Sequence, residues 1–169
     1  LPQGQGAGGE AEVPHPVTTT VEALRKRMAE IRWTHTLDLG DGLVTPGLWP
    51  PMDIVAAGCP KDLRGMKVLD LGTADGGCAF QAERLGAASV LATDCYLWGD
   101  APGTSRAAFD FAREALGSRV EGRYLPVLDH SPETVGVFDL VLFLGVLYHL
   151  RHPLLALERL FSVTGGQAI

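Results

Sequence analysis

The sequence predicts an α/β fold built on a doubly wound parallel sheet, and three observations carry this prediction. Three short apolar segments have the length of strands and lie at residues 68–71, 89–93 and 138–144, and a weaker strand candidate lies at residues 120–125. Helical patterns of apolar residues alternate with them, at residues 78–85, 105–116 and 154–161. Strands and helices that alternate in this way form the right-handed crossovers of a parallel sheet. The last strand segment is almost wholly apolar, as expected where helices cover both faces of a sheet.

Glycine residues mark where several of these elements end. Gly72 follows the first strand, Gly86 stops the helix at residues 78–85, and Gly117 follows the helix at residues 105–116. Four strands are visible in the sequence, so we expect the sheet to be truncated after its fourth strand, with an open edge that a longer polypeptide would cover.

Two regions precede the first strand. Residues 1–16 are rich in Gly, Pro and Gln and have no periodic pattern, so a flexible leader is expected there. In residues 17–62, here called the N-terminal extension, Thr19 and Glu22 match a capping box. Apolar residues at helical spacing follow and predict about three helical turns, and the Gly and Pro residues beyond residue 33 predict a loop. We expect the extension to act as a lid over a domain at residues 63–169.

Composition limits the function classes. The formal net charge is −6 at pH 7, and the longest basic run is Arg25-Lys26-Arg27, whereas nucleic-acid-binding domains usually have a basic face. This balance disfavours nucleic acid as a partner without excluding it. No apolar run is long enough for a membrane span. The three dispersed cysteines are typical of reduced thiols in a cytoplasmic protein, and no cluster with metal-ligand spacing is visible, so no metal is expected.

The segment from Asp70 to Gly77 is the first candidate site. It is a Gly-rich turn between a strand and a helix, where small residues let a ligand approach the backbone. Asp94 ends the second strand, 24 positions after Asp70, where a carboxylate can bind both hydroxyls of an adenosine ribose. Together the two features predict a nucleoside-type ligand. Because Ala74 replaces the second glycine of the dinucleotide pattern, an NAD-dependent oxidoreductase is the weaker alternative.

A third feature narrows the class. The segment at residues 136–154, which contains "FDLV" and "GVLYHL" before a proline, resembles the fourth strand and following turn of class I S-adenosylmethionine (SAM)-dependent methyltransferases. Val163-Thr164-Gly165-Gly166 resembles the turn that precedes the fifth strand of this family. The resemblance covers residues 63–169 and implies their Rossmann-like fold and SAM as cofactor. "GVLYH" and the upstream "GLVTPG" further resemble the tRNA (mo5U34) methyltransferase-like subgroup and its carboxymethyl-transferring relatives.

The resemblance implies roles for individual residues. Asp70 would hold the amino group of SAM, Asp94 the ribose and Asp129 the adenine amino group, while Tyr148 would close over the reactive end. The remaining cofactor-binding residues would line the methionine end or offer carbonyls near the sulfonium, and they are Gly72, Thr73, Ala74, Gly76, Leu144 and Gly145. The relative that uses carboxy-SAM has a lysine near the position of Thr34 or His35; none is present here, so ordinary SAM is expected.

The acceptor side is less well defined. His149 and His35 are candidate general bases, because imidazole titrates near neutral pH; a buried structural role is the alternative for His149. Trp33, His35 and Trp49 are expected at the acceptor entrance, because the extension that carries them can fold over the cofactor strand. We expect methyl transfer from SAM to a small molecule, such as a specialised metabolite. The alternatives are a tRNA wobble-uridine methyltransferase-like enzyme and a non-catalytic SAM-binding module.

Overall fold

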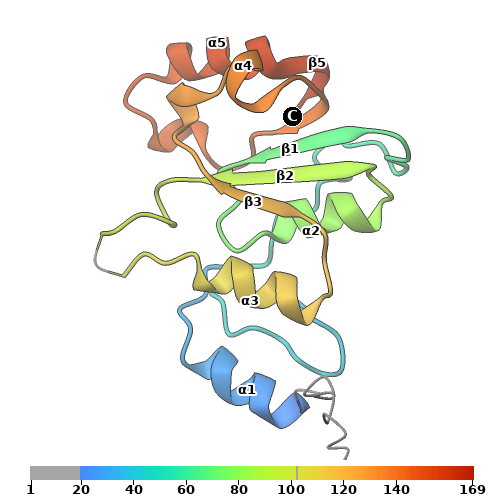
Figure 1. The fold of residues 1–169 in the computed structure, drawn as a ribbon, viewed down its shortest axis with the longest axis vertical. Coiled ribbons are helices and arrows are strands. Elements are labelled where there is room, and N and C mark those ends of the chain that lie inside the picture. Colours follow the sequence, from blue (N-terminus) through green and yellow to red (C-terminus); the bar gives the residue numbers. More distant parts are fainter. Residues whose placement is uncertain (1–19, 102) are drawn as a thin grey trace, which may run out of the picture.

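Five parallel strands form one sheet in the order β3-β2-β1-β4-β5 (Figure 1). The structure is a computed structural model, and it describes residues 20–101 and 103–169. The flexible leader predicted at residues 1–16 lies outside these residues, as does Thr19 of the predicted capping box. The strands are β1 (Lys67–Leu71), β2 (Ser89–Asp94), β3 (Glu121–Tyr124), β4 (Phe138–Leu142) and β5 (Thr164–Ala168).

The fifth strand corrects the expectation that the sheet stops after four strands. Residues Thr164–Ala168 pair in parallel with β4, with a register irregularity between Phe138 and Leu140. A side chain at Gly166 would collide with the backbone carbonyl of Asp139, and one at Gly165 would press on Val137. The glycine pair that was interpreted as a turn is therefore part of a strand, in which the missing side chains let β5 lie close to β4.

Helices cover both faces of the sheet (Figure 1). On one face lie α2 (Gly77–Arg84) and α3 (Ala107–Ala115), with α1 (Val21–Ala29) beyond α3; on the other lie α4 (Pro132–Val135) and α5 (Pro153–Val163). Alternate residues of β1 enter two separate cores: Val68 packs in the core that contains Phe109, and Leu69 packs in the core that contains Val163. A strand buried on both faces has apolar residues in succession, which explains the apolar strand segments.

The N-terminal extension is docked on α3. The Arg27 guanidinium donates two hydrogen bonds to the Glu114 carboxylate, at 2.8 and 2.9 Å, and lies 5.2 Å from the centre of the Phe111 ring. Thr20 is the residue that caps α1, since its hydroxyl accepts a hydrogen bond from the Ala23 amide at 3.3 Å. In the part of the chain that the structure describes, no helix has both the length and the apolar composition needed to cross a membrane.

The topology places the candidate site. Chain order runs outward from β1 to β3 in one direction and from β1 to β5 in the other, so the direction of winding changes between β1 and β4. In open α/β sheets, ligands bind at the carboxyl ends of the strands beside this change. Asp70 near the end of β1 and Asp94 at the end of β2 both lie at that edge.

Candidate functional site

The turn after β1 requires glycine at its first position. Gly72 has φ +83°, and a side chain there would collide with the side chain of Val146, which follows β4. The amides of Gly72 and Thr73 donate hydrogen bonds of 2.8 and 3.0 Å to the Thr93 carbonyl on β2. The turn is thus fixed to β2 on one side and contacts the segment after β4 on the other.

The two predicted halves of the site contact each other through Asp94. This side chain is buried; one carboxylate oxygen accepts a hydrogen bond from the Ala74 amide at 3.0 Å, and the other accepts one from the Leu97 amide at 2.9 Å. Ala74 has φ +52°, and its carbonyl accepts a hydrogen bond of 2.8 Å from the Trp98 indole. Each carboxylate oxygen has a further lone pair, so Asp94 can still accept hydrogen bonds from a ligand.

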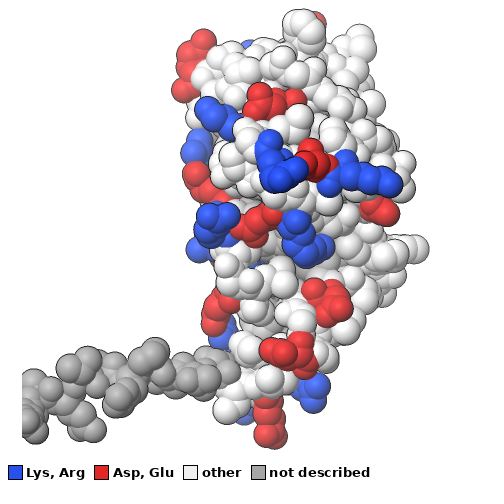
Figure 2. Space-filling view, turned by 90° about the vertical axis from the view of Figure 1, so that its right-hand side faces the viewer, with Lys and Arg blue, Asp and Glu red and all other residues white. Residues whose placement is uncertain are grey.

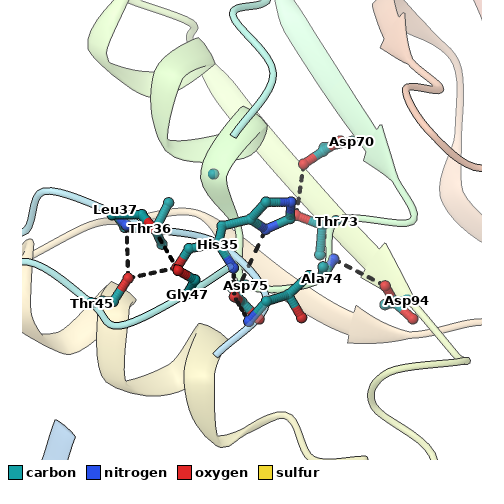
Figure 3. Close-up of polar contacts among 12 residues, drawn as sticks. His35, Thr36, Leu37, Thr45, Gly47, Asp70, Thr73, Ala74, Asp75 and Asp94 are labelled. Atoms are coloured by element: carbon teal, nitrogen blue, oxygen red, sulfur yellow. Dashed lines mark hydrogen bonds and ion pairs between the residues drawn. The ribbon is translucent and has the colours of Figure 1, made fainter. Parts of the chain in front are cut away.

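Asp70 lies beneath the turn, buried in the sheet. The Thr73 hydroxyl donates a hydrogen bond of 2.6 Å to its carboxylate (Figure 3). Burial, with a smaller contribution from the charge of Asp94, raises the pKa of Asp70 to about 6, although the Thr73 hydrogen bond opposes the shift. A carboxylate that is costly to keep charged without a partner suits the binding of a cationic amino group.

Asp75 is a site residue that the sequence interpretation missed. It is buried, and one of its oxygens accepts hydrogen bonds from the backbone amides of Thr34 and His35, both at 2.7 Å. The same oxygen lies 3.8 Å from Nδ1 of His35 (Figure 3). Burial raises the pKa of Asp75 and lowers that of His35. Its partners lie about 40 residues earlier in the chain, so no local pattern could have revealed the contact.

His130 was also missed, although it follows the predicted adenine-contacting residue Asp129. It is fully buried, and its Nδ1 lies 3.1 Å from the Pro126 carbonyl. Nδ1 therefore carries the hydrogen, and Nε2 accepts a hydrogen bond of 3.1 Å from the Thr93 hydroxyl. Burial lowers the pKa of His130, which agrees with a neutral ring. This histidine ties the end of β2 to the short helix η1 (Val127–Asp129), which carries Asp129 on the surface.

The segment after β4 borders the turn, since the Val146 side chain lies against Gly72. Gly145 has φ +75°, and the Tyr148 hydroxyl lies near the space that a side chain at Gly145 would occupy. Tyr148 itself is 78% exposed, and its ring lies 4.3 Å from that of His149, within the short helix η2 (Leu147–His149). The buried structural alternative for His149 is wrong, because its side chain is exposed. Leu144 is half-buried and lies between β4 and η2.

The three residues expected at the acceptor entrance do not lie together. Trp33 is buried, donates a hydrogen bond of 3.0 Å from its indole to the Met28 carbonyl, and packs edge-on against Phe111. The expectation that Trp33 lines the entrance is therefore wrong: its apolar ring joins α1 to α3 in the core. Trp49 is 66% exposed and lies beside His35, because the two residues pair in an isolated parallel β-bridge.

A pocket of about 340 Å³ opens beside Asp75. Its wall combines hydroxyl groups, one guanidinium and one exposed aromatic ring, from Arg32, Thr34, Tyr96, Thr104 and Ser105. Such a wall suits a small polar molecule. Across residues 20–101 and 103–169, no group of three or more His, Cys, Asp or Glu side chains is arranged to hold a metal ion.

Comparisons with known proteins identify the fold. The chain is similar to the N-terminal domain of EvdMO1, whose crystal structure was determined in the presence of SAH and D-fucose: identity is 25%, the TM-score is 0.63, and the match covers 85% of this chain and 60% of that domain. Against full-length EvdMO1 the identity is 25% and the TM-score 0.64, with 88% and 35% covered. A SAM-dependent methyltransferase from Mesorhizobium loti is 22% identical, with a TM-score of 0.52 and 68% and 49% covered.

These similarities show the class I SAM-dependent methyltransferase fold, as the sequence predicted. The chain spans about 60% of the length of the EvdMO1 domain. No family model and no curated protein matches the chain. The closer likeness to the tRNA (mo5U34) methyltransferase-like subgroup stays a prediction.

Proposed function

We propose that this chain binds SAM and contributes to the transfer of its methyl group to a small-molecule acceptor. The observation that carries the proposal is the pair of buried carboxylates, Asp70 and Asp94, held on either side of the Gly-rich turn at the change in strand order. Support comes from the EvdMO1 domain, which has the same fold and was crystallised with SAH, the product that SAM leaves after methyl transfer.

The residues present fit such a ligand. The Asp70 carboxylate would pair with the amino group of SAM, Asp94 would accept hydrogen bonds from the ribose hydroxyls, and Asp129 would contact the adenine. The methionine end would lie along Gly72, Thr73, Ala74 and Gly76, with the carbonyls of Leu144 and Gly145 near the sulfonium and Tyr148 over it. SAM supplies an activated methyl group with a good leaving group, so the protein mainly aligns the reactants.

A small, hydroxyl-bearing acceptor fits the chain better than RNA. The pocket beside Asp75 has a polar wall of the right scale, and the EvdMO1 domain was crystallised in the presence of a sugar, D-fucose. On the face in Figure 2, Lys and Arg residues are interspersed with Asp and Glu rather than gathered into a basic stripe. RNA binding draws much of its affinity from neutralised phosphates. We propose that the N-terminal extension, with His35 and Trp49, forms the lid on this side.

The test is titration calorimetry with SAM, SAH and NAD, followed by a screen of free sugars and other alcohols with methyl-labelled SAM. We expect SAM and SAH to bind and NAD not to bind, and label to appear in a small hydroxylated product. Binding of SAM without transfer to any acceptor would favour the non-catalytic module. Binding of NAD in preference to SAM would contradict the proposal.

A further inference from the structure

His35 and Asp75 form a pair that cofactor binding alone does not require. Nδ1 of His35 lies 3.8 Å from the Asp75 carboxylate, and the side chains are 24% and 6% exposed. Within the described residues, Nδ1 is the one buried side-chain polar atom that lacks a hydrogen-bond partner. A buried polar group without a partner is costly, and one beside a carboxylate points to a proton-handling role.

The backbone around His35 is fixed from three directions. The Asp75 carboxylate accepts hydrogen bonds from the backbone amides of Thr34 and His35. The Thr45 hydroxyl donates a hydrogen bond of 2.6 Å to the His35 carbonyl. A side chain at Gly47 would collide with the His35 backbone, so this glycine permits close packing. Because the segment is held in this way, the imidazole needs no large rearrangement to act.

At 3.8 Å from the Asp75 carboxylate, Nδ1 makes no hydrogen bond to it. A hydrogen on Nδ1 would point toward that carboxylate and leave the lone pair of Nε2 free to accept a proton. Figure 3 shows the ring turned toward the Gly-rich turn that bears Thr73 and Ala74. In the proposed arrangement SAM would lie along this turn, so a base at this position would be beside it.

We propose that His35 is the general base for the acceptor hydroxyl and that Asp75 is its positioning residue, which also stabilises the imidazolium. This inference rests on the proposed methyl transfer. The acceptor oxygen bonds to the methyl carbon while the carbon–sulfur bond breaks, and that electron pair remains on sulfur as a neutral thioether. The hydroxyl proton moves to Nε2 of His35 and is then released to water.

The pair also defines the acceptor class. An aliphatic hydroxyl keeps its proton at neutral pH and benefits from a base, whereas an amine has a free lone pair once neutral. The acceptor is therefore an alcohol, such as a hydroxyl of a sugar ring. Burial lowers the pKa of His35, which keeps the ring neutral and able to accept a proton. The charged groups near the pair are Asp94, whose charge acts on Asp75, and Arg32, which lines the pocket together with Asp75.

Three variants test the pair, with His152→Gln, an exposed histidine outside the site, as the control. His35→Gln removes the base. Asp75→Asn keeps a carbonyl oxygen that can accept both backbone amides but removes the charge, and Asp75→Ala removes both. The measurements are SAM affinity by calorimetry, SAH formation against pH with D-fucose and other 6-deoxyhexoses as acceptor probes, and an NMR titration of the His35 imidazole.

We expect His35→Gln to bind SAM with at most a threefold change and to lose about 10²- to 10⁴-fold in rate, together with the acidic limb of the pH profile. Asp75→Asn should lower the pKa of His35 in the NMR titration and move the acidic limb to lower pH. Asp75→Ala should also lower the melting temperature. An unchanged rate in His35→Gln, or a loss confined to SAM affinity, would overturn the proposal while leaving methyl transfer intact.

The failure of the proposed function is a separate result, because it would appear as absent SAM binding in the unaltered chain. If none of the sugar probes is methylated, the NMR titration decides whether Asp75 acts on the His35 imidazole. A lower pKa of His35 in Asp75→Asn supports the pair, and an identical titration in both proteins overturns it.

Discussion

At the scale of single residues, the carboxylates of the site have structural as well as binding roles. Asp94 accepts hydrogen bonds from two backbone amides, of Ala74 and Leu97, in addition to any contact with a ribose. Loss of this side chain would leave both amides without their partner. Its substitution therefore tests ligand binding and the shape of the turn together.

Asp94→Ala should weaken SAM binding tenfold or more, because a charge-assisted interaction is worth about 1.5–3 kcal/mol. It should also lower the free energy of unfolding by about 1–3 kcal/mol, since the Ala74 amide is buried with its acceptor removed. Calorimetry and chemical denaturation measure the two effects. Asp100→Ala, in the exposed loop beyond Asp94, is the matched control. Equal SAM affinity in Asp94→Ala and the control would refute the ribose assignment.

Asp70 predicts a pH dependence of stability. Its pKa in the folded, ligand-free protein is raised from 3.8 to about 6, so folding favours the protonated form. The resulting stability is fully present below about pH 4 and is lost as the pH rises through 6. Asp70→Asn removes this loss, so its free energy of unfolding relative to that of the unaltered chain should be up to about 3 kcal/mol larger at pH 8 than at pH 4. SAM affinity should fall in the same variant. A difference in stability that does not change with pH would contradict the assignment.

At the scale of elements, the sequence predicts β1, β2, β4, α2, α3 and α5 well, because apolar patterns report burial directly. β3, whose residues are exposed or half-buried, matches the weaker strand candidate. Prediction from the sequence fails where a contact between distant segments determines the structure. β5 has a glycine pair that is typical of a turn, and only packing against β4 makes it a strand. Asp75 binds amides about 40 residues away. Trp33 is expected at the acceptor entrance because the extension can fold over the cofactor strand, but Trp33 is buried and packs against Phe111 on α3.

The contact between Gly72 and Val146 predicts a steric coupling between the turn after β1 and the segment after β4. Gly72 and Gly40 have nearly the same φ, +83° and +84°, but a side chain at Gly40 meets nothing within 4 Å. Gly40→Ala should cost about 1–2 kcal/mol of stability, for the left-handed backbone alone. Gly72→Ala should cost a further 1–3 kcal/mol or so from overpacking.

Thermal and chemical denaturation measure both variants of this comparison. When Val146→Ala is added to Gly72→Ala, the double variant should regain part of the stability that Gly72→Ala lost. When it is added to Gly40→Ala, it should restore none. If Gly72→Ala and Gly40→Ala prove equally stable, the turn and the segment after β4 are not in contact.

At the scale of the whole molecule, charge distribution separates the two acceptor classes. A net charge of −6 and the mixed charges in Figure 2 predict weak attraction to polyanions. We expect no submicromolar binding of tRNA in filter-binding assays at 50 mM salt. Tight binding that weakens steeply between 50 and 200 mM salt, together with methyl transfer to tRNA, would contradict the small-molecule proposal.

The central claim is that the turn between Asp70 and Gly77, together with Asp94, forms a SAM site. Titration calorimetry of the chain with SAM, alongside Asp94→Ala and Asp100→Ala, tests it most directly. The account predicts one SAM per chain, displacement by SAH, a loss of affinity of tenfold or more in Asp94→Ala, and no change in Asp100→Ala. Absence of SAM binding by the folded, unaltered chain, or equal binding by all three proteins, would contradict it.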